Sequence, residues 1–414
     1  MKQPVETPPY LKQVRIRDYA PLRDAKVDFK PGLNIIIGSN GAGKTRFLSL
    51  TSRLANLYEE QFDGIDCELT LSGPYEIKVR FEEQPYDEEN ERIPRRDTES
   101  LIIVGTYNEV AVSANMLEYV VEDLTDDYDF HYSAISIKHG VPSARLLVAD
   151  ESVELVIGKR GGIISVDGGT KQVENVETRF VVTLIRSLIR VIRGGWIVSS
   201  KKAMPLISLE EARELTETTV NGYLDRINTK IDLYSPIKAI RHGATYQIYR
   251  NPVQEEIIIK GLVLEYQVGN TWLPFSALSD GTKRIFYIIA ELLAPTGMSF
   301  DGKKTQMVWR DRDEIIFLEE PELGIHPEQL HKLLSLIREV SREHQVIMTT
   351  HSPQVLDMLS EKELDRITIC ELDPKKGTQF RKLSRAKQKE ARAYMREKLH
   401  LSDYWRYSYL EEKD

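Results

Sequence analysis

The sequence GSNGAGKT, from Gly38 to Thr45, decides the fold class. It matches the phosphate-binding pattern G-x-x-x-x-G-K-[ST] at every fixed position. It follows LNIIIG (33–38), an apolar run typical of a strand that is buried on both faces. The segment after it has apolar residues spaced to face a core: Phe47, Leu48, Leu50 and Leu54. A chance match is the alternative, and this strand-and-helix context argues against it.

The loop predicts a site for ATP and Mg²⁺. Glycines let the backbone curl so that successive N–H groups point at phosphate oxygens, and the start of the helix adds a favourable dipole. Lys44 supplies positive charge to the outer phosphates, and the Thr45 hydroxyl is a ligand for Mg²⁺. The predicted nucleotide-binding residues are Gly38, Ser39, Asn40, Gly41, Ala42, Gly43, Lys44 and Thr45.

A second motif, EIIFLEEPELGIHP (314–327), ends an apolar strand in two carboxylates. Glu319 at the strand tip is the expected partner of Mg²⁺, and Glu320 can orient or deprotonate the attacking water. The alternative is a strand that runs into a solvated acidic turn. The preceding phosphate loop and the following strand, QVIMTTHSP (345–353), favour a catalytic function. His351 ends that second strand, where it could sense the terminal phosphate through a hydrogen bond.

A third motif, LSDGTKR (278–284), precedes an apolar helix. Ser279 and Gly281 at a helix N-terminus can form an anion-binding cradle. Because the chain already has one phosphate loop, this second cradle would close over the ATP held by another copy of the protein. The alternative is a plain helix cap by Ser279 or Thr282.

The rest of the chain places these motifs in an α/β protein. Alternating apolar segments between 65 and 165 predict strands, and Ser208 with Glu211 forms a capping-box pattern at the start of a helix. From 255 to about 371 strands and helices alternate, which implies a parallel core. The predicted fold is a P-loop NTPase of the ABC ATPase head type, with an antiparallel β subdomain and a helical insertion. The predicted segments are a first lobe (1–173), the insertion (174–235), a second lobe (236–371) and a basic-aromatic tail (372–414).

Composition indicates a cytoplasmic, soluble protein. The formal net charge is −8, so the chain as a whole is not a basic nucleic-acid coat. The cysteines, Cys67 and Cys370, lack a metal-ligand spacing and argue against a disulfide scaffold. The most apolar long stretch (180–198) is interrupted by three arginines, and no signal peptide precedes it, so we expect no membrane partner.

Four elements resemble the ABC ATPase family in their order along the chain, and within it the RecF, SMC and OLD branch. They are the phosphate loop (38–45), LSDGTKR (278–284), the acidic strand end (314–327) and the histidine-bearing strand (345–353). LRDAKVDFKPGLNIIIGSNGAGKT (22–45), EEPELGIHP (319–327) and TTHSPQVLDML (349–359) are similar to stand-alone ATPases found beside bacterial antiphage effectors. The resemblance implies that Glu319 and Glu320 take the Walker B and general-base roles. It also implies that Ser279 and Gly281 act on a partner's ATP, and that His351 is the switch histidine.

The chain departs from the family pattern in several places. Glu319 replaces the usual Walker B aspartate. LSDGTKR (278–284) corresponds to the family's signature sequence, and Asp280 and Thr282 depart from it. No residue is assigned to the family's Q-loop glutamine. Ser279 lies 235 positions after Lys44, much further than in transporter subunits. Only 63 residues follow His351, too few for the Toprim nuclease domain of OLD proteins, so we expect any nuclease or toxin to be a separately encoded effector.

Two basic segments leave open whether the protein binds nucleic acid. Arg179, Arg186, Arg190 and Arg193 share one helical face, which is either a DNA contact or a solvated face over a core. From Lys375 to Lys398 there are ten Lys or Arg against two Glu, followed by four aromatic residues between 404 and 409. That tail is either a docking or stacking surface or an amphipathic helix packed on its own core.

These observations predict an ATPase that dimerises around ATP and gates DNA or an effector in antiphage defence. The alternatives are a RecF-like DNA repair ATPase and an ATP-stabilised scaffold with little hydrolysis.

Overall fold

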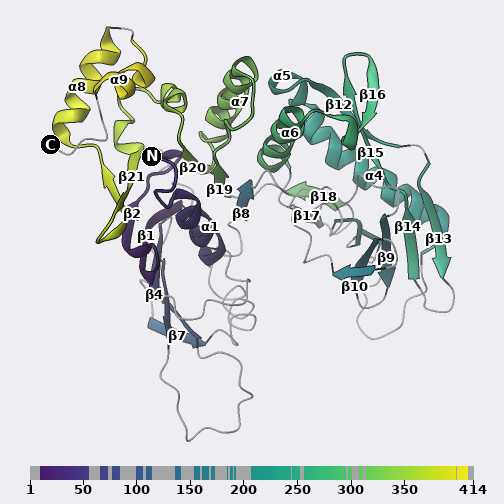
Figure 1. Cartoon of the computed structure of the whole chain (residues 1–414). Coiled ribbons are helices and arrows are strands. Elements are labelled where there is room, and N and C mark those ends of the chain that lie inside the picture. Colours follow the sequence, from purple (N-terminus) through teal and green to yellow (C-terminus); the bar gives the residue numbers. More distant parts are fainter. Residues whose placement is uncertain are drawn as a thin grey trace, which may run out of the picture. The chain divides into compact units, whose positions relative to one another are not determined.

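A computed structural model of the chain describes nineteen stretches of residues. They are 10–55, 66–72, 77–83, 99–105, 109–113, 136–140, 153–158, 161–166, 169–172, 184, 187–189, 191–192, 207–243, 245–251, 256–294, 297–300, 307–310, 314–397 and 399–408. The chain divides into two compact units (Figure 1). The first contains residues 1–140, 312–323 and 337–414, and the second contains 141–311 and 324–336.

A six-stranded sheet forms the centre of the first unit. Its order is β22-β21-β3-β20-β19-β8, and every neighbouring pair is parallel except β21 and β22. The strands are β3 (Leu33–Ile37), β8 (Ser136–Gly140), β19 (Glu314–Glu319), β20 (Gln345–Thr350), β21 (Ile367–Asp373) and β22 (Gly377–Lys382). All residues of β3 are buried, as its apolar run predicts, and all residues of β20 are buried as well.

The strand register brings the predicted motifs to one edge of this sheet. Thr350 pairs with Ile37, so the chain leaves β20 beside the point where the phosphate loop leaves β3. Glu319 pairs with Thr349, which places the end of β19 at the same level. Because all three strands are parallel, their carboxyl ends lie side by side, where open α/β sheets bind their ligands.

An antiparallel sheet of order β2-β1-β4-β5-β6-β7 completes this unit. Its strands are β1 (Tyr10–Tyr19), β2 (Leu22–Asp28), β4 (Asp66–Ser72), β5 (Ile77–Glu83), β6 (Glu99–Gly105) and β7 (Glu109–Ser113). Helix α1 (Lys44–Ala55) follows the phosphate loop. Phe47, Leu48 and Leu50 are buried in one cluster with Leu69 of β4 and Phe317 of β19, as the spacing predicted. The core therefore joins both sheets to the helix that begins at Lys44.

The described residues of the second unit form three antiparallel sheets. Their orders are β11-β10-β9-β14-β13, β12-β15-β16 and β17-β18. The strands are β9 (Val153–Gly158), β10 (Gly161–Val166), β11 (Gly169–Gln172), β12 (Ile237–His242), β13 (Gln247–Asn251), β14 (Glu256–Lys260), β15 (Leu264–Val268), β16 (Thr271–Pro274), β17 (Gly297–Phe300) and β18 (Met307–Arg310).

Helices α4 (Leu209–Asn228), α5 (Ile231–Tyr234) and α6 (Asp280–Leu293) belong to the same unit. The Ser208 side chain accepts a hydrogen bond from the Glu211 N–H at 3.1 Å, so the predicted N-cap of α4 is confirmed. The predicted arginine face of Arg179, Arg186, Arg190 and Arg193 lies outside the described residues. The bounds of the four predicted domain segments stay a prediction.

The C-terminal segment belongs to the first unit. It contains helices α8 (Arg385–Arg396) and α9 (Leu401–Ser408) and the short helices η6 (Pro353–Met358) and η7 (Leu364–Arg366). Helix α7 (Pro327–Val340) is divided between the units, with residues 327–336 in the second and 337–340 in the first. Ser402 in α9 donates to Asp357 in η6 through its N–H (2.8 Å) and its hydroxyl (2.7 Å). Tyr404 and Trp405 are buried, whereas Tyr407 is 78% exposed. The alternative of a helix packed on its own core therefore holds for Tyr404 and Trp405. Within the described part of the chain, no helix combines the length and apolar character that a membrane crossing requires.

Candidate nucleotide site

The phosphate loop is anchored to β21 and β22. The Ala42 carbonyl accepts hydrogen bonds from the Thr378 hydroxyl at 2.9 Å and from the Cys370 thiol at 3.4 Å. Burial raises the pKa of Cys370 to about 12, so this thiol keeps its proton and acts as a donor. Gly43 has a φ of 101°, a conformation that favours glycine, and a Cβ at this position would collide with Thr378. The loop therefore needs a glycine next to the carbonyl that β21 and β22 hold.

Lys44 keeps its ammonium inside the loop. Its side chain is 4% exposed, and Nζ donates to the carbonyls of Gly38 (2.8 Å) and Ser39 (2.9 Å). Nζ also lies 3.9 Å from Glu320 Oε1. A buried ammonium needs such acceptors to offset its lost hydration. The loop thus places one positive charge beside the acidic turn.

Glu320 begins that turn in an unusual backbone conformation. Its φ is 40°, the only positive value for a described residue other than glycine, and its N–H donates to the Thr349 carbonyl at 3.0 Å. A side chain in the left-handed region costs on the order of 1 kcal/mol, and such strain is concentrated at functional sites. This turn places the Glu320 carboxylate near both Lys44 and His351.

His351 lies between two carboxylates. Its Nδ1 is 3.4 Å from Glu320 Oε1 and 3.5 Å from Glu322 Oε1. The position directly after β20 explains this placement, because β20 neighbours β19 in the sheet. The structure therefore brings together the predicted Lys44, Glu320 and His351.

Glu322 is a site residue that the sequence analysis missed. Its side chain is 5% exposed, and Oε1 accepts hydrogen bonds from the Thr350 hydroxyl (2.5 Å) and the His351 N–H (3.2 Å). The other oxygen, Oε2, is buried with no hydrogen-bond partner among the described residues. Glu322 is the third carboxylate of the sequence EEPE, and that repetition was the available signal. The residue links the acidic turn to the end of β20.

A cavity of about 750 Å³ opens over these groups. This volume is typical of sites for small ligands and cofactors. Tyr19 contributes an aromatic wall, with the Arg46 guanidinium 4.6 Å from its ring centre, and neither residue was predicted. The other lining residues are Pro21, Asn40, Gly41, Gly43, Lys44, Thr45, Ser49, Leu50, Glu320, Leu323 and His351.

The cavity does not include every predicted residue. Ser39 is exposed, Gly38 and Ala42 are buried, and Glu319 is half-buried at the end of β19, and none of them is among the lining residues. The chemistry of the lining fits a nucleotide with Mg²⁺. The loop offers backbone donors and an ammonium to phosphates, the exposed Thr45 offers a hydroxyl, and Glu320 offers a carboxylate.

The predicted signature residues belong to the second unit. Ser279 caps α6: its Oγ accepts from the Thr282 N–H at 3.3 Å and lies 2.8 Å from the Thr282 hydroxyl. Gly281 follows in the first turn, and a Cβ there would lie 3.1 Å from the Gly324 carbonyl. Within one chain Ser279 thus acts as the helix cap that the sequence analysis gave as the alternative. The first turn of α6 also contains Asp280, whose side chain is fully exposed.

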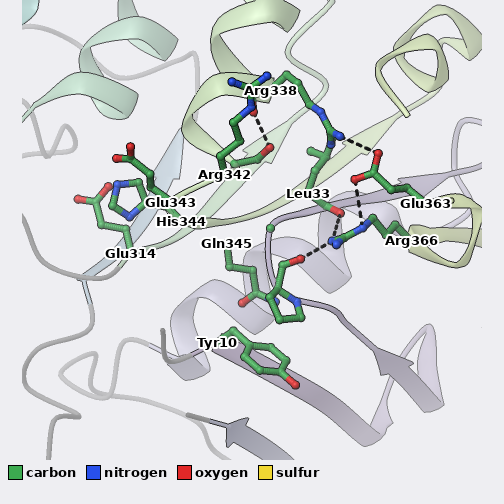
Figure 2. A pocket seen from close by; sticks show the side chains of 13 residues that line it. Tyr10, Leu33, Glu314, Arg338, Arg342, Glu343, His344, Gln345, Glu363 and Arg366 are labelled. Carbon is green, nitrogen blue, oxygen red and sulfur yellow. Dashed lines mark hydrogen bonds and ion pairs between the residues drawn. The ribbon is translucent and has the colours of Figure 1, made fainter. Parts of the chain in front are cut away.

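A smaller cavity of about 360 Å³ lies at the start of β3, β19 and β20, the opposite edge of the sheet (Figure 2). Three of its charged residues, Arg338, Glu363 and Arg366, are paired with one another. Glu363 accepts from Arg338 Nη2 at 2.6 Å and lies 3.5 Å from Arg366 Nε, and Arg366 donates to the carbonyls of Pro31 and Leu33. This network ties α7 and η7 to the start of β3, which is a structural role.

The fold and the site define a P-loop NTPase of the ABC ATPase head type. The parallel sheet, the phosphate loop after β3, the acidic turn after β19 and the histidine after β20 are its parts. The structure contains the parallel sheet, the antiparallel sheets and the helices that this fold class predicts, so the predicted fold class is confirmed.

Comparison with known proteins agrees with this class. Residues 201–357 match the family model described as "AAA domain, putative AbiEii toxin, Type IV TA system", and residues 13–49 match a model described as "AAA domain". The Septu protein PtuA of Bacillus thuringiensis is 22% identical over 87% of this chain and 76% of its own length. The DNA replication and repair protein RecF of Lactococcus lactis is 38% identical over 17% of this chain and 19% of its own length. These matches confirm the resemblance to the ABC ATPase branch that includes RecF and SMC.

Solved structures of SMC heads are also similar to this chain. The SMC head domain of Pyrococcus furiosus, bound to the C-terminal domain of ScpA, aligns with a TM-score of 0.46 and 15% identity over 94% of this chain and 100% of its own. The SMC head domain of Thermotoga maritima aligns with a TM-score of 0.41 and 11% identity over 90% and 99%.

Proposed function

We propose that this chain binds and hydrolyses ATP with Mg²⁺ and dimerises head to tail around the nucleotide. The observation that carries the proposal is the convergence of Lys44, Glu320 and His351 on one cavity at the carboxyl ends of three neighbouring parallel strands. Lys44 and the N–H groups of the loop hold the phosphates. Glu320 accepts a proton from the attacking water, and His351 donates a hydrogen bond to the terminal phosphate.

Mg²⁺ supplies positive charge that offsets the phosphate charges, and Thr45 and Glu319 are the residues we assign to it. Glu319 is one methylene longer than the aspartate of the family pattern, which keeps the charge and extends its reach.

The dimer follows from the chemistry of the signature. Ser279 and Gly281 begin α6, where backbone N–H groups and the helix dipole favour an anion. We assign them to the ATP of the partner copy, so that nucleotide state becomes dimer geometry. ATP binding would close the pair, and hydrolysis by Glu320 would reopen it.

The biological role we propose is antiphage defence with a separately encoded nuclease or toxin as the effector. The resemblance of the motifs to defence ATPases carries this assignment, and the match to a Septu protein over most of the chain supports it. Infection assays on cells that carry the gene with its neighbours, with wild-type chain or Lys44→Ala, test the role. Equal phage yields with both forms would contradict it.

The mass in solution tests the biochemical core. Glu320→Gln keeps the shape of the site but removes the base, so we expect ATP with Mg²⁺ to trap it as a dimer, while the nucleotide-free protein has a lower mass. Ser279→Asp keeps a helix-capping side chain but adds a negative charge towards phosphate. In the Glu320→Gln background it should abolish the shift in mass without abolishing ATP binding.

Two results would overturn parts of the proposal. A mass that ignores bound ATP would contradict the ATP-sandwich dimer. ATP-dependent assembly of the wild-type protein with no phosphate release would favour the scaffold alternative, in which Ser279 and Asp280 stabilise an assembly rather than a catalytic site.

A further inference from the structure

Helix α8 segregates its charges on its surface. Arg385, Lys389, Arg392 and Arg396 have the spacing i, i+4, i+7 and i+11, so they form one stripe along the helix. The helix buries Ala391 on another face. We call these four cations the α8 stripe. Glu390 follows Lys389 in the sequence, and Glu397 follows Arg396. Each of these carboxylates is therefore about 100° round the helix from the stripe.

The stripe is accessible and only partly neutralised. Arg385, Lys389 and Arg396 are exposed, and Arg392 is half-buried. Arg396 pairs with Glu361 at 2.8 Å, and the Arg392 Nε donates to the Glu361 backbone carbonyl at 3.1 Å. Among the described residues, the stripe thus has one ion pair, that of Arg396 with Glu361. The side chains of Arg385 and Lys389 have no hydrogen bond or ion pair within the described part of the chain.

The start of α8 is electrostatically unfavourable for the isolated helix. Its first turn has no acidic residue and contains Arg385 and Lys387, although the N-terminus of a helix has a partial positive charge. Ser384 caps the helix and accepts from the Lys387 N–H at 3.2 Å. Cations at this end lower stability slightly, and a bound anion would reverse that effect. This second observation favours a negatively charged ligand.

We propose that the α8 stripe binds the phosphate backbone of a nucleic-acid duplex. An extended row of cations matches a polyanion, and three of the four are arginines, whose planar guanidinium group suits phosphate. A protein partner would require an apolar centre at its interface, and the stripe contains no apolar side chain. Contacts of this kind carry no sequence information, so the binding is independent of base sequence.

The proposed function does not say whether the protein binds nucleic acid, and the α8 stripe provides a surface for it. Binding at this surface does not require ATP. The test is fluorescence anisotropy of the full chain with a labelled 30-base-pair DNA duplex, without ATP, over a range of KCl concentrations. Arg385→Gln/Lys389→Gln should weaken binding at least roughly tenfold at 0.1 M salt. It should also reduce the slope of log affinity against log salt by about 2, because two phosphate contacts are lost.

The matched control is Lys375→Gln/Lys376→Gln. These two exposed lysines lie between β21 and β22, off the stripe, and the double substitution changes the net charge equally. We expect it to leave the slope nearly unchanged. Equal losses in both double variants would overturn the proposal, because they would show a general effect of charge. An unchanged slope in the stripe variant would overturn it too, and so would loss of binding to an acidic protein with DNA binding intact.

Lys44→Ala separates this proposal from the proposed function. It should lose ATP binding and keep its affinity for the duplex, and both stripe and control variants should keep ATP binding and thermal stability.

Discussion

Glu322 and His351 are joined by the backbone as well as by their side chains. The His351 N–H donates to Glu322 Oε1 at 3.2 Å, and the same oxygen lies 3.5 Å from His351 Nδ1. Glu320 Oε1 faces that nitrogen at a similar distance, 3.4 Å. The acidic turn after β19 therefore holds the end of β20 through two carboxylates, one buried and one facing the nucleotide cavity. Both carboxylate oxygens lie beside the same ring nitrogen, so they hold the imidazole ring in one orientation.

We expect Glu322→Gln to slow ATP hydrolysis without preventing ATP binding. The amide keeps the size of the side chain but loses the charge that orients His351, so kcat should fall about tenfold to a hundredfold while the Kd of ATP changes less than about threefold. Stopped-flow phosphate release and nucleotide titration measure the two quantities. Glu328→Gln is the matched control, because its carboxylate is 71% exposed on α7. Unchanged kcat, or a loss of binding equal to the loss of kcat, would contradict the positioning role.

The Thr378 hydroxyl should control the affinity of the phosphate loop. A trans peptide points its C=O and N–H in opposite directions. Because Thr378 and Cys370 hold the Ala42 carbonyl, the Gly43 N–H of the same peptide is directed away from β22. Thr378→Val removes one of these hydrogen bonds, typically worth about 1 kcal/mol, so the Kd of ATP should rise about fivefold. Thr378→Ser keeps the hydroxyl and should bind as the wild type does. Equal affinities of the valine and serine variants would refute this role.

The sequence predicted the parts of the site that depend on local pattern. The loop from Gly38 to Thr45, Glu320 and His351 each follow an apolar strand, and parallel strands bring their carboxyl ends together. Glu322 and Thr378 could not be found in this way. Their roles depend on contacts across strands: Thr378 lies 336 positions from Ala42, and Glu322 lies 28 positions from Thr350.

The basic-aromatic tail (372–414) also shows what sequence pattern cannot decide. Its aromatic residues had two open interpretations, because sequence pattern does not tell which face of α9 meets η6. In the structure Tyr404 is buried and its hydroxyl donates a hydrogen bond to Glu390 at 2.8 Å, so the face of α9 that contains Tyr404 is the packed one. Tyr407 is exposed.

Tyr19 should contribute affinity for the base of ATP. It lines the cavity, with the Arg46 guanidinium 4.6 Å from its ring centre, and we expect the base to stack on the part of this ring that faces the cavity. Stacking of a base on an aromatic ring is worth about 1–3 kcal/mol. We expect Tyr19→Ala to raise the Kd of ATP about tenfold and to leave the Kd of inorganic tripolyphosphate unchanged. Tyr19→Phe should behave as the wild type does. An equal effect on both ligands would show that Tyr19 shapes the phosphate loop instead.

Glu363 should make stability depend on pH at the opposite edge of the sheet. Burial raises its pKa, but hydrogen bonds from Arg338 and Ser360 outweigh this effect and lower the pKa from 4.5 to about 2. The unfolded chain therefore takes up the proton first as pH falls. The stabilising contribution is complete above about pH 4.5 and is lost as pH falls towards 2. The difference in pKa corresponds to about 3 kcal/mol, and partial exposure should reduce it to about 2 kcal/mol.

Urea unfolding of Glu363→Gln at several pH values tests this account. The variant should be about 2 kcal/mol less stable than the wild type at pH 7, and the difference should shrink steadily below pH 4.5, because a protonated Glu363 and a glutamine are alike in charge and shape. Glu343→Gln is the control, since that exposed carboxylate lines the same cavity and is two residues from the Gln345 that begins β20. It should cost little at any pH. A difference for Glu363→Gln that stays constant from pH 7 to pH 3 would show that the glutamine disturbs packing, and that the charge of Glu363 does not hold Arg338 in place.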